Sequence, residues 1–433
     1  MSGTDYAGGA ATTPAPLLFL IADTGGGHRN AARAVGQALD RMYPGRFAPV
    51  LCDPLSGPGS ARLLRWVTGL YGPAIRLAPW LWGAAYHGCN SRPAMGLLRR
   101  TLLQLADRPA ADAARTHRPV AIVSFHPLTG MAAVSAKDQS APGAAVVTVV
   151  TDLATMHAAW RYADADLIIA PSGAVSGRRI PQRPDGGLIT APLGAVSGRR
   201  SPQRPSGSRW VSAGSPVTRE FWAGPLQPDE RAILRRSLGI GEDRFLVLLT
   251  GGGEGSGGIA RRAVAILRRC DDVDVVAVCG HNLRLKRRLD RLATRSGGRL
   301  TVTSFVRNMA DWLRCADLVV TKAGPGTIAE ATCCGVPLLL TSHVPGQEKG
   351  NTEFVTGADA GRHVPSVRRL VTEIGRLRND RAAVDMMRAA SARLGRPTAT
   401  AHIAELIADL IPAAPAAANS EITKDSRHMR PRI

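Results

Sequence analysis

The chain has 433 residues, of which 45% are apolar and 21% are charged. This length is more than one hydrophobic core usually serves, so we expect two domains, and the composition argues against a fibrous or largely disordered chain. The net charge of +21 indicates phosphate-rich partners, but no helix-turn-helix, zinc-finger or RNP motif accompanies it, so no nucleic-acid partner is expected. The seven cysteines include no Cys-x-x-Cys pair, which argues against a zinc site or a disulfide framework and favours a reducing cytosol.

The first part of the chain alternates apolar strands with helical stretches. Residues 1–16 have neither the basic nor the apolar region of a signal peptide, and we expect them to be a disordered tail. A buried strand is predicted at 17–22, followed by a glycine loop and an alanine-rich helix, and further strands at 121–125, 144–150 and 166–170. Because helical segments separate the first of these strands, the pattern predicts a parallel sheet.

Residues 171–208 interrupt this pattern. They are rich in Gly, Pro, Ser and Arg, and "GAVSGRRIPQRP" at 173–184 recurs as "GAVSGRRSPQRP" at 194–205. Two copies are too few for a solenoid. We therefore interpret the repeat as a tandem duplication that lengthens a surface loop.

The second half of the chain returns to the strand–helix alternation, which predicts a second doubly wound sheet. Its strands are expected at 244–250, 273–280, 300–305, 317–321 and 335–342. We therefore predict an α/β protein with a first domain over 17–213, a second domain over 214–412 and a disordered tail over 413–433.

Three glycine-rich turns follow predicted strands, at 24–29, 250–258 and 323–327. Glycine lets a ligand approach the backbone closely, and the amide groups at the start of the next helix favour an anion such as a diphosphate. A single turn of this kind is equally compatible with a purely structural role. None has the GxxxxGK[ST] spacing of a P-loop, and none is a GxGxxG followed by an acidic residue on the next strand, so a nicotinamide enzyme is disfavoured.

Polar residues near the third turn are candidates for sugar recognition. Glu330 follows Gly324 by six residues, where a carboxylate could accept the hydroxyls of a ribose or simply stabilise the helix start. "PGQEKGN" at 345–351 carries Gln347 and Glu348, which suit sugar hydroxyls, although a solvated polar loop explains them equally well.

Taken together, these segments resemble the GT-B glycosyltransferases of the monogalactosyldiacylglycerol synthase type, a group related to processive diacylglycerol glucosyltransferases and to the lipid-linked N-acetylglucosamine transferase of peptidoglycan synthesis. In the second half the resemblance rests on "TGGGEG" at 250–255, "SFVRNM" at 304–309, "KAGPGTIAEA" at 322–331 and "PGQEKGN". In the first half it rests on "DTGGGHR" at 23–29, "SFHPL" at 124–128 and "VTDLATMHAAW" at 150–160. It implies two Rossmann-like domains that face each other across a cleft.

The resemblance also implies roles for individual residues. His28 corresponds to the catalytic or acceptor-orienting histidine, the backbone near Val306 to the uracil contact, and Glu330 to the ribose contact. Gln347 and Glu348 correspond to residues that read the sugar. The implied diphosphate contacts are Gly251, Gly252, Gly253, Gly324, Pro325, Gly326 and Thr327.

Two residues are candidates for the general base. An imidazole with a pKa near 6.5 can take a proton from an alcohol at neutral pH, and His28 lies on a glycine loop after a strand, where open α/β sheets bind ligands. Asp152 also follows a strand, and the sequence does not decide between the two residues. A helix cap is the alternative role for each. No metal-ligand cluster accompanies them, so neither a metal nor a cofactor is expected.

Residues 54–106 contain no Asp or Glu, six arginines and five aromatic residues. Tryptophan and arginine together suit the interface of an anionic bilayer, and Pro73 and Pro79 prevent one long helix. The stretch also resembles the membrane-facing insertion of the family. A buried helical layer that happens to lack acids is the alternative.

The sequence thus predicts a transferase that moves a hexose from a UDP-sugar to a lipid hydroxyl, with diacylglycerol as the first choice of acceptor, and the family resemblance implies that it inverts the anomeric centre. We expect it at the cytoplasmic face of the plasma membrane as a peripheral protein. A UDP-sugar epimerase of the same fold, a transferase with another acceptor, and a binding protein without turnover are the alternatives.

Overall fold

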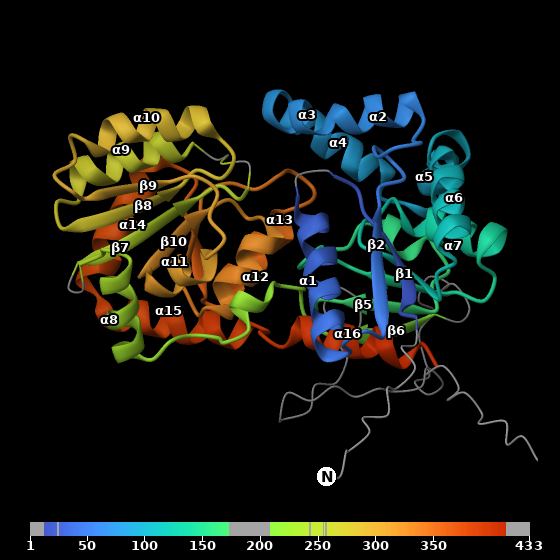
Figure 1. Cartoon of the computed structure of the whole chain (residues 1–433). Helices are drawn as coiled ribbons and strands as arrows, with labels where there is room; N and C mark the ends of the chain where they lie inside the picture. The colour runs from blue at the N-terminus through green and yellow to red at the C-terminus, as the bar shows by residue number, and fades with distance from the viewer. Residues whose placement is uncertain are drawn as a thin grey trace, which may run out of the picture.

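The computed structural model describes residues 13–23, 26–172, 208–241, 244–253, 255 and 258–412. They form two lobes that lie side by side, each built on one six-stranded sheet (Figure 1). The strand order is β2-β1-β3-β4-β5-β6 in the first lobe and β12-β11-β10-β7-β8-β9 in the second, and every paired strand is parallel. The predicted pair of doubly wound domains is confirmed.

The first lobe contains the elements up to β6. Its strands are β1 (Ala15–Leu20), β2 (Phe47–Cys52), β3 (Ala121–Ser124), β4 (Ala145–Val149), β5 (Leu167–Ala170) and β6 (Arg209–Ser212). Its helices are α1 (Gly27–Met42), α2 (Arg62–Gly69), α3 (Tyr71–Leu77), α4 (Pro79–Cys89), α5 (Arg92–Thr101), α6 (Asp107–His117) and α7 (Gly130–Ser140), with 3-10 turns at Leu103–Ala106 and Ala158–Arg161.

The second lobe begins after a 3-10 turn at Arg219–Phe221. Its strands are β7 (Phe245–Thr250), β8 (Val273–Val278), β9 (Leu300–Thr303), β10 (Leu318–Thr321), β11 (Leu338–Leu340) and β12 (Gly361–His363). The helices that follow β6 are α8 (Pro228–Ser237), α9 (Ile259–Arg269), α10 (Leu283–Ala293), α11 (Met309–Cys315), α12 (Pro325–Cys333), α13 (Lys349–Gly357), α14 (Val367–Asn379), α15 (Arg381–Leu394) and α16 (Ala399–Asp409).

Helices cover both faces of each sheet because the inner strands are apolar on both sides. In β1, Leu17 and Phe19 belong to one buried cluster, while Leu18 and Leu20 belong to another on the opposite face. Successive side chains of a strand point to opposite faces, so an unbroken apolar run needs cover on both. The strand β7 divides its side chains between two clusters in the same way.

Three strands that the sequence analysis did not predict lie at sheet edges: β2, β6 and β12. Edge strands need less apolar sequence because one side and part of a face remain in contact with solvent. The strand β2 also contains Pro49, which an edge tolerates. The predicted tail over 1–16 is wrong at its end, because Ala15 and Pro16 pair with β2 and begin β1; residues 1–12 lie outside the described residues.

The last helix returns to the first lobe. Residues Ile403 and Ile407 of α16 belong to the same buried cluster as Leu17 and Phe19 of β1. The predicted assignment of everything from 214 to 412 to the second domain is therefore wrong for α16. The reason is that α1 has apolar residues that its own sheet does not fully cover. Residues of α16 pack against them in the same buried cluster. The duplicated segment predicted to be a surface loop falls largely outside the described residues, between 172 and 208.

The chain therefore crosses between the lobes twice, and the two crossings touch. The amide of Val217 donates to Thr400 Oγ1 at 2.8 Å, and that hydroxyl donates to the Val217 carbonyl at 2.7 Å. Gly214 has a φ of +94°, and a Cβ there would lie 2.7 Å from the Cβ of Ala399. Glycine is needed at this position for both its conformation and its size.

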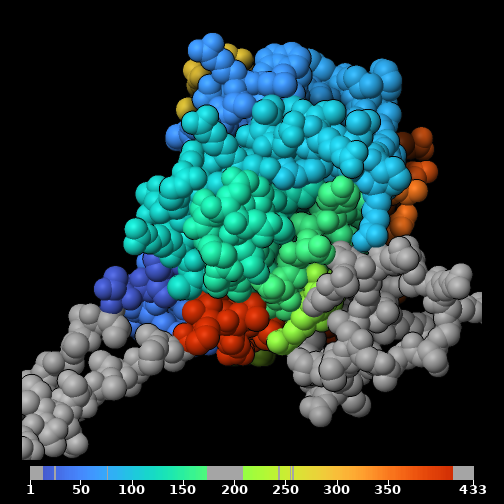
Figure 2. Space-filling view, turned by 90° about the vertical axis from the view of Figure 1, so that its right-hand side faces the viewer, coloured from blue at the N-terminus to red at the C-terminus, as the bar shows by residue number. Residues whose placement is uncertain are grey.

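The acid-free segment forms the helices α2 to α5 on the upper side of the first lobe (Figures 1 and 2). The chain breaks between α3 and α4 at Ala78, immediately before Pro79, as the prolines predicted. Side chains on α2 to α4 expose large apolar surfaces, with exposed fractions of 65% for Trp66, 85% for Leu77 and 73% for Trp80. These helices thus present an apolar face that the rest of the lobe does not cover.

Candidate functional site

The predicted site residues all lie after the carboxyl ends of strands. His28 follows β1 and Asp152 follows β4, while Gly251 to Gly253 follow β7, Gly324 follows β10 and Gln347 follows β11. Ligands of open α/β sheets bind at this edge. Figure 1 shows α1 of the first lobe and α12 and α13 of the second on the sides where the lobes meet.

His28 is held in one tautomer. Its Nδ1 lies 2.8 Å from the carbonyl oxygen of Phe125 and 2.8 Å from Thr151 Oγ1. A carbonyl only accepts, so Nδ1 carries the proton and Nε2 carries the lone pair. Burial lowers the pKa of His28 to about 4, although the Phe125 bond opposes this shift. At neutral pH the ring is therefore a neutral base, and its neighbour His126, 4.5 Å away ring to ring, is neutral as well because burial lowers its pKa.

Asp152 lies in the interior, with 6% of its surface exposed. Its Oδ2 accepts a hydrogen bond from Trp160 Nε1 at 2.7 Å. Burial raises the pKa of Asp152 to about 6, the bonds from Trp160 and the His157 backbone oppose the rise, and the charge of Glu348 adds to it. The carboxylate is thus ionised at neutral pH, and the candidates His28 and Asp152 are both in their basic forms.

The amino end of α12 carries the third glycine turn. Ile328 is the residue whose amide first bonds back into the helix, to the Gly324 carbonyl at 3.1 Å. Among the described residues, the amides of Gly326 and Thr327 have no acceptor, since no side chain caps this helix and Pro325 has no N–H. A Cβ built on Gly326 meets nothing within 4 Å, so open space lies in front of these donors. This end of α12 can hold an anion.

A cation lies beside this turn. Lys322 Nζ donates to Glu348 Oε1 at 2.7 Å, and the other oxygen, Oε2, accepts from the amide of Val344 at 2.9 Å. Both oxygens of the predicted sugar residue Glu348 thus already have protein partners. Gln347 is half-buried, and its Oε1 lies 3.4 Å from the phenolic oxygen of Tyr71 on α3.

The remaining residues predicted to bind the UDP-sugar are Glu330, Val306 and the glycines after β7. Burial raises the pKa of Glu330 to about 8, and the charge of Glu220 adds to the rise, so this side chain is largely protonated at neutral pH. Val306 packs against the core of the second lobe. Gly252 has a φ of +70°, and the carbonyl of Gly253 accepts from the His281 amide at 2.8 Å, which fixes this turn against the end of β8.

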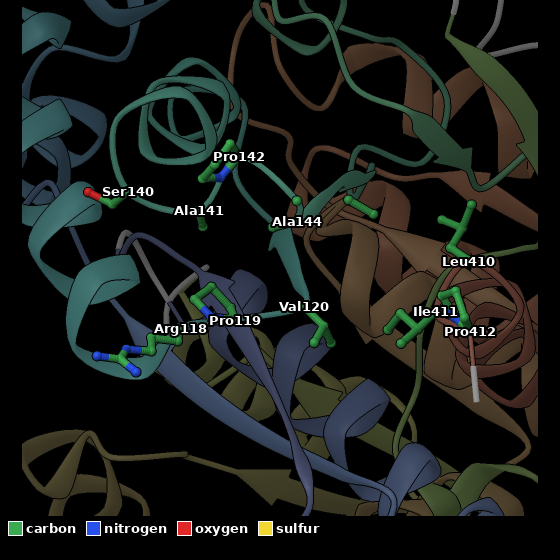
Figure 3. Close-up of a pocket in the computed structure, with 12 residues that line it drawn as sticks. Arg118, Pro119, Val120, Ser140, Ala141, Pro142, Ala144, Leu410, Ile411 and Pro412 are labelled. Atoms are coloured by element: carbon green, nitrogen blue, oxygen red, sulfur yellow. The ribbon is translucent and has the colours of Figure 1, made fainter. Parts of the chain in front are cut away.

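A hollow that lies away from this edge is not part of the site. It is lined by residues such as Val120, which precedes β3, and Ala144, which precedes β4, together with the end of α16 (Figure 3). These are the amino ends of the strands, opposite the end that carries His28 and Asp152. None of the predicted site residues lines it.

Comparison with known proteins identifies the family. The family model described as "Monogalactosyldiacylglycerol (MGDG) synthase" matches residues 28–179. The chain is 31% identical over 369 residues to "Probable monogalactosyldiacylglycerol synthase 2, chloroplastic" of Oryza sativa subsp. indica, covering 83% of this chain and 73% of that protein. The chain belongs to the monogalactosyldiacylglycerol synthase family. Monogalactosyldiacylglycerol synthase 1 of Arabidopsis thaliana is 28% identical over 371 residues, which cover 83% of this chain and 64% of that protein.

Membership of this family makes the protein a glycosyltransferase. The second lobe agrees, because the model described as "Glycosyltransferase family 28 C-terminal domain" matches residues 246–397. MurG of Acinetobacter baumannii has a TM-score of 0.53 at 15% identity over 92% of this chain and 100% of its own. HepE of Anabaena, in complex with UDP and glucose, has a TM-score of 0.51 at 16% identity over 91% of this chain and 99% of its own. These likenesses confirm the GT-B fold.

An epimerase has the same fold. A UDP-GlcNAc 2-epimerase of Neisseria meningitidis, bound to UDP-GlcNAc, has a TM-score of 0.54 at 12% identity, over 91% of this chain and 100% of its own. Fold likeness alone therefore does not distinguish transferase from epimerase, whereas the family does. Within the part of the chain that the structure describes, no helix is both long and apolar enough to cross a bilayer.

Sequence reasoning missed several residues of this candidate site. Lys322 had a signal, because the chain has only five lysines and this one immediately precedes the third glycine turn. Trp160, which donates a hydrogen bond to the Asp152 carboxylate, lies eight residues after it in the sequence. No helical or strand periodicity links the two positions, so their contact could not be predicted. Tyr71 had no local signal at all, because its contact Gln347 lies 276 residues away.

Proposed function

We propose that the protein transfers a hexose from a UDP-sugar to a lipid hydroxyl, with diacylglycerol as acceptor and with inversion at the anomeric carbon. The observation that carries this proposal is the amino end of α12, where the amides of Gly326 and Thr327 have no acceptor within the described part of the chain and lie beside the Lys322 cation. Such a group of donors suits the diphosphate of a UDP-sugar. The family's named members, which are monogalactosyldiacylglycerol synthases, support a lipid acceptor.

In this proposal the reaction is a single displacement. A base takes the proton from the acceptor hydroxyl, the hydroxyl oxygen bonds to the anomeric carbon, and the bond from that carbon to the diphosphate oxygen breaks on the opposite face. UDP leaves with its negative charge stabilised by the α12 amides. His28 suits the base because its Nε2 lone pair is available at neutral pH, and Asp152 is the alternative.

The acceptor reaches the site from a membrane, in our proposal through α2 to α4. Trp66 and Trp80 are exposed large side chains on these helices, and Arg62 and Arg65 are exposed beside them. Tryptophan rings and arginine headgroup contacts together attach peripheral proteins to anionic bilayers. We place this surface at the cytoplasmic face of the plasma membrane, which suits the seven free cysteines. Fractionation of cells that express the protein tests this location.

The direct test is a matrix of donors and acceptors. The full chain is incubated with UDP-galactose, UDP-glucose or UDP-N-acetylglucosamine and with vesicles that contain diacylglycerol, and the lipids are read by mass spectrometry. The expected product is a β-linked hexosyl-diacylglycerol with at least one donor. If no sugar enters the lipid fraction with any donor, while the UDP-sugars are converted to their epimers, the epimerase alternative replaces this proposal.

A further inference from the structure

The loop before α13 and the first turn of α13 contact the first lobe. In each of these contacts, one of the two residues is a glycine. A Cβ on Gly346, whose φ is +80°, would lie 2.7 Å from Cδ1 of Tyr86 on α4. A Cβ on Gly83 of α4 would lie 2.9 Å from the Cβ of Pro345. At Gly350 an added Cβ would overlap Cγ2 of Thr155. The two lobes are therefore so close here that a side chain larger than that of glycine would clash at each of these three positions.

Polar contacts reinforce this approach. The phenolic oxygen of Tyr71 lies 3.4 Å from Gln347 Oε1, and Thr155 Oγ1 lies 3.5 Å from the Gln347 carbonyl oxygen. Burial raises the pKa of Tyr71 well above its usual value, and the charges of Glu348 and Asp152 add to the rise. The phenol thus stays protonated and donates to Gln347, while it lies near carboxylates of both lobes.

The same loop is tied to the anion-binding turn. Glu348 binds Lys322 through Oε1, and Asn351 Nδ2 donates to the carbonyl of Ala323 at 2.9 Å. Lys322 and Ala323 directly precede Gly324. The loop over 344–351 is therefore held from the second lobe by bonds next to the α12 amides, and from the first lobe by the contacts of Thr155, Tyr71 and Tyr86.

We propose that the first lobe sets the position of the sugar-recognition loop at 344–351, with Thr155, Tyr71 and Tyr86 as positioning residues for the hexose of the donor. The inference rests on the proposed function, in which the α12 amides hold the diphosphate, and on the sugar-reading role that the family resemblance implies for Gln347 and Glu348 in this loop. It predicts that contacts from the opposite lobe change the recognition of the hexose while the recognition of UDP stays the same.

Gly350→Ala is the sharpest perturbation. Carbon atoms normally approach to about 3.5–4.0 Å, so the overlap with Thr155 forces a displacement on the order of 1 Å. Alanine favours a helix over glycine, which offsets part of the cost of the overlap, so the variant should still fold. A shift of about 1 Å is enough to break hydrogen bonds between the loop and the hexose, and each lost bond lowers affinity about two- to tenfold. We expect the preference for a UDP-hexose over UDP to fall by about ten- to a hundredfold.

The experiment is calorimetry with the full chain, with UDP, UDP-galactose and UDP-glucose as separate ligands. Adding Thr155→Ser to Gly350→Ala removes Cγ2 and should restore much of the preference. Tyr71→Phe should lower it about two- to tenfold, as for the loss of one hydrogen bond. Gly357→Ala is the matched control, because it lies on the same helix and an added Cβ there meets nothing within 4 Å.

The outcomes separate the inference from the proposed function. Equal losses for UDP and UDP-hexoses in Gly350→Ala, or no rescue by Thr155→Ser, overturn the positioning role. Loss of hexose preference with unchanged UDP affinity and rescue by the double variant supports it. If the parent chain binds no UDP, the proposed function itself fails, and the inference fails with it.

Discussion

Replacing Asp152 with Asn should stabilise the protein at neutral pH. Asp152 is buried, and its pKa is raised from 3.8 to about 6. A carboxyl group whose pKa is higher in the folded state than in the unfolded state costs stability once it ionises. This cost is absent below the unfolded value of 3.8, grows as the pH rises to about 6, and is complete above that value. An amide side chain at this position never ionises, so the substitution removes the cost.

The magnitude follows from the difference between the two pKa values. A rise of about two pH units corresponds to roughly 3 kcal/mol. Asn keeps an oxygen for the Trp160 indole but replaces the second oxygen with an NH2 group, which costs about 1 kcal/mol at any pH. We therefore expect Asp152→Asn to gain about 2 kcal/mol near pH 8 and to lose about 1 kcal/mol near pH 4, a pH-dependent change of roughly 3 kcal/mol.

Urea unfolding followed by tryptophan fluorescence measures this change, and Trp160 is a reporter in direct contact with the substituted residue. Asp112→Asn is the control, because Asp112 lies on the exposed side of α6, where its ion pair with Arg115 contributes about 0–1 kcal/mol. The reasoning is refuted if Asp152→Asn destabilises the chain equally at both pH values, or if its benefit appears only in acid.

Four further predictions concern other parts of the molecule. His28→Ala should lower kcat about 10²- to 10⁴-fold, and kcat/KM of the parent should be flat above about pH 5 if His28 is the base, whereas a rise through about pH 6 would assign that role to Asp152. Gly326→Asp should weaken UDP binding in calorimetry at least about tenfold without unfolding the chain, because its Cβ enters open space; unchanged affinity would remove the diphosphate from this turn. Trp80→Ser should reduce co-sedimentation with anionic vesicles and leave Tm unchanged, since this ring is 73% exposed; full retention on vesicles would contradict the membrane role. Asp317→Asn should cost about 3–5 kcal/mol in urea unfolding because Arg231 and Arg235 lose their shared buried partner; a loss below about 1 kcal/mol would contradict that account.

The inner strands could be predicted from sequence because burial on both faces demands an unbroken apolar run. All predicted strands from 17–22 to 335–342 correspond to inner strands or to β9. The edge strand β12 consists of Gly361, Arg362 and His363, and nothing in that composition indicates a strand. Its conformation comes from pairing with β11, which is a tertiary effect.

The sequence predicts where the site residues lie more fully than it predicts their protonation states and contacts. Glycine turns after apolar strands located the ends of both sheets, because parallel strands bring those ends to one edge. The protonation of His28 depends on the Phe125 carbonyl, 97 residues away, and on burial by the complete lobe. The contact of Tyr71 with Gln347 depends on how the lobes meet, which no local pattern encodes.

The paired crossings at Val217 and Thr400 limit how the halves of this enzyme can move. A single connection would let one lobe rotate freely against the other. We expect two connecting segments, joined by reciprocal hydrogen bonds, to allow hinge opening and to resist twisting. Protease nicking near 214–217 should therefore leave the two halves attached, and a fragment that ends before 399 should lack the cover of α1. The first lobe is thus completed by a helix that the chain reaches only after it has built the second lobe.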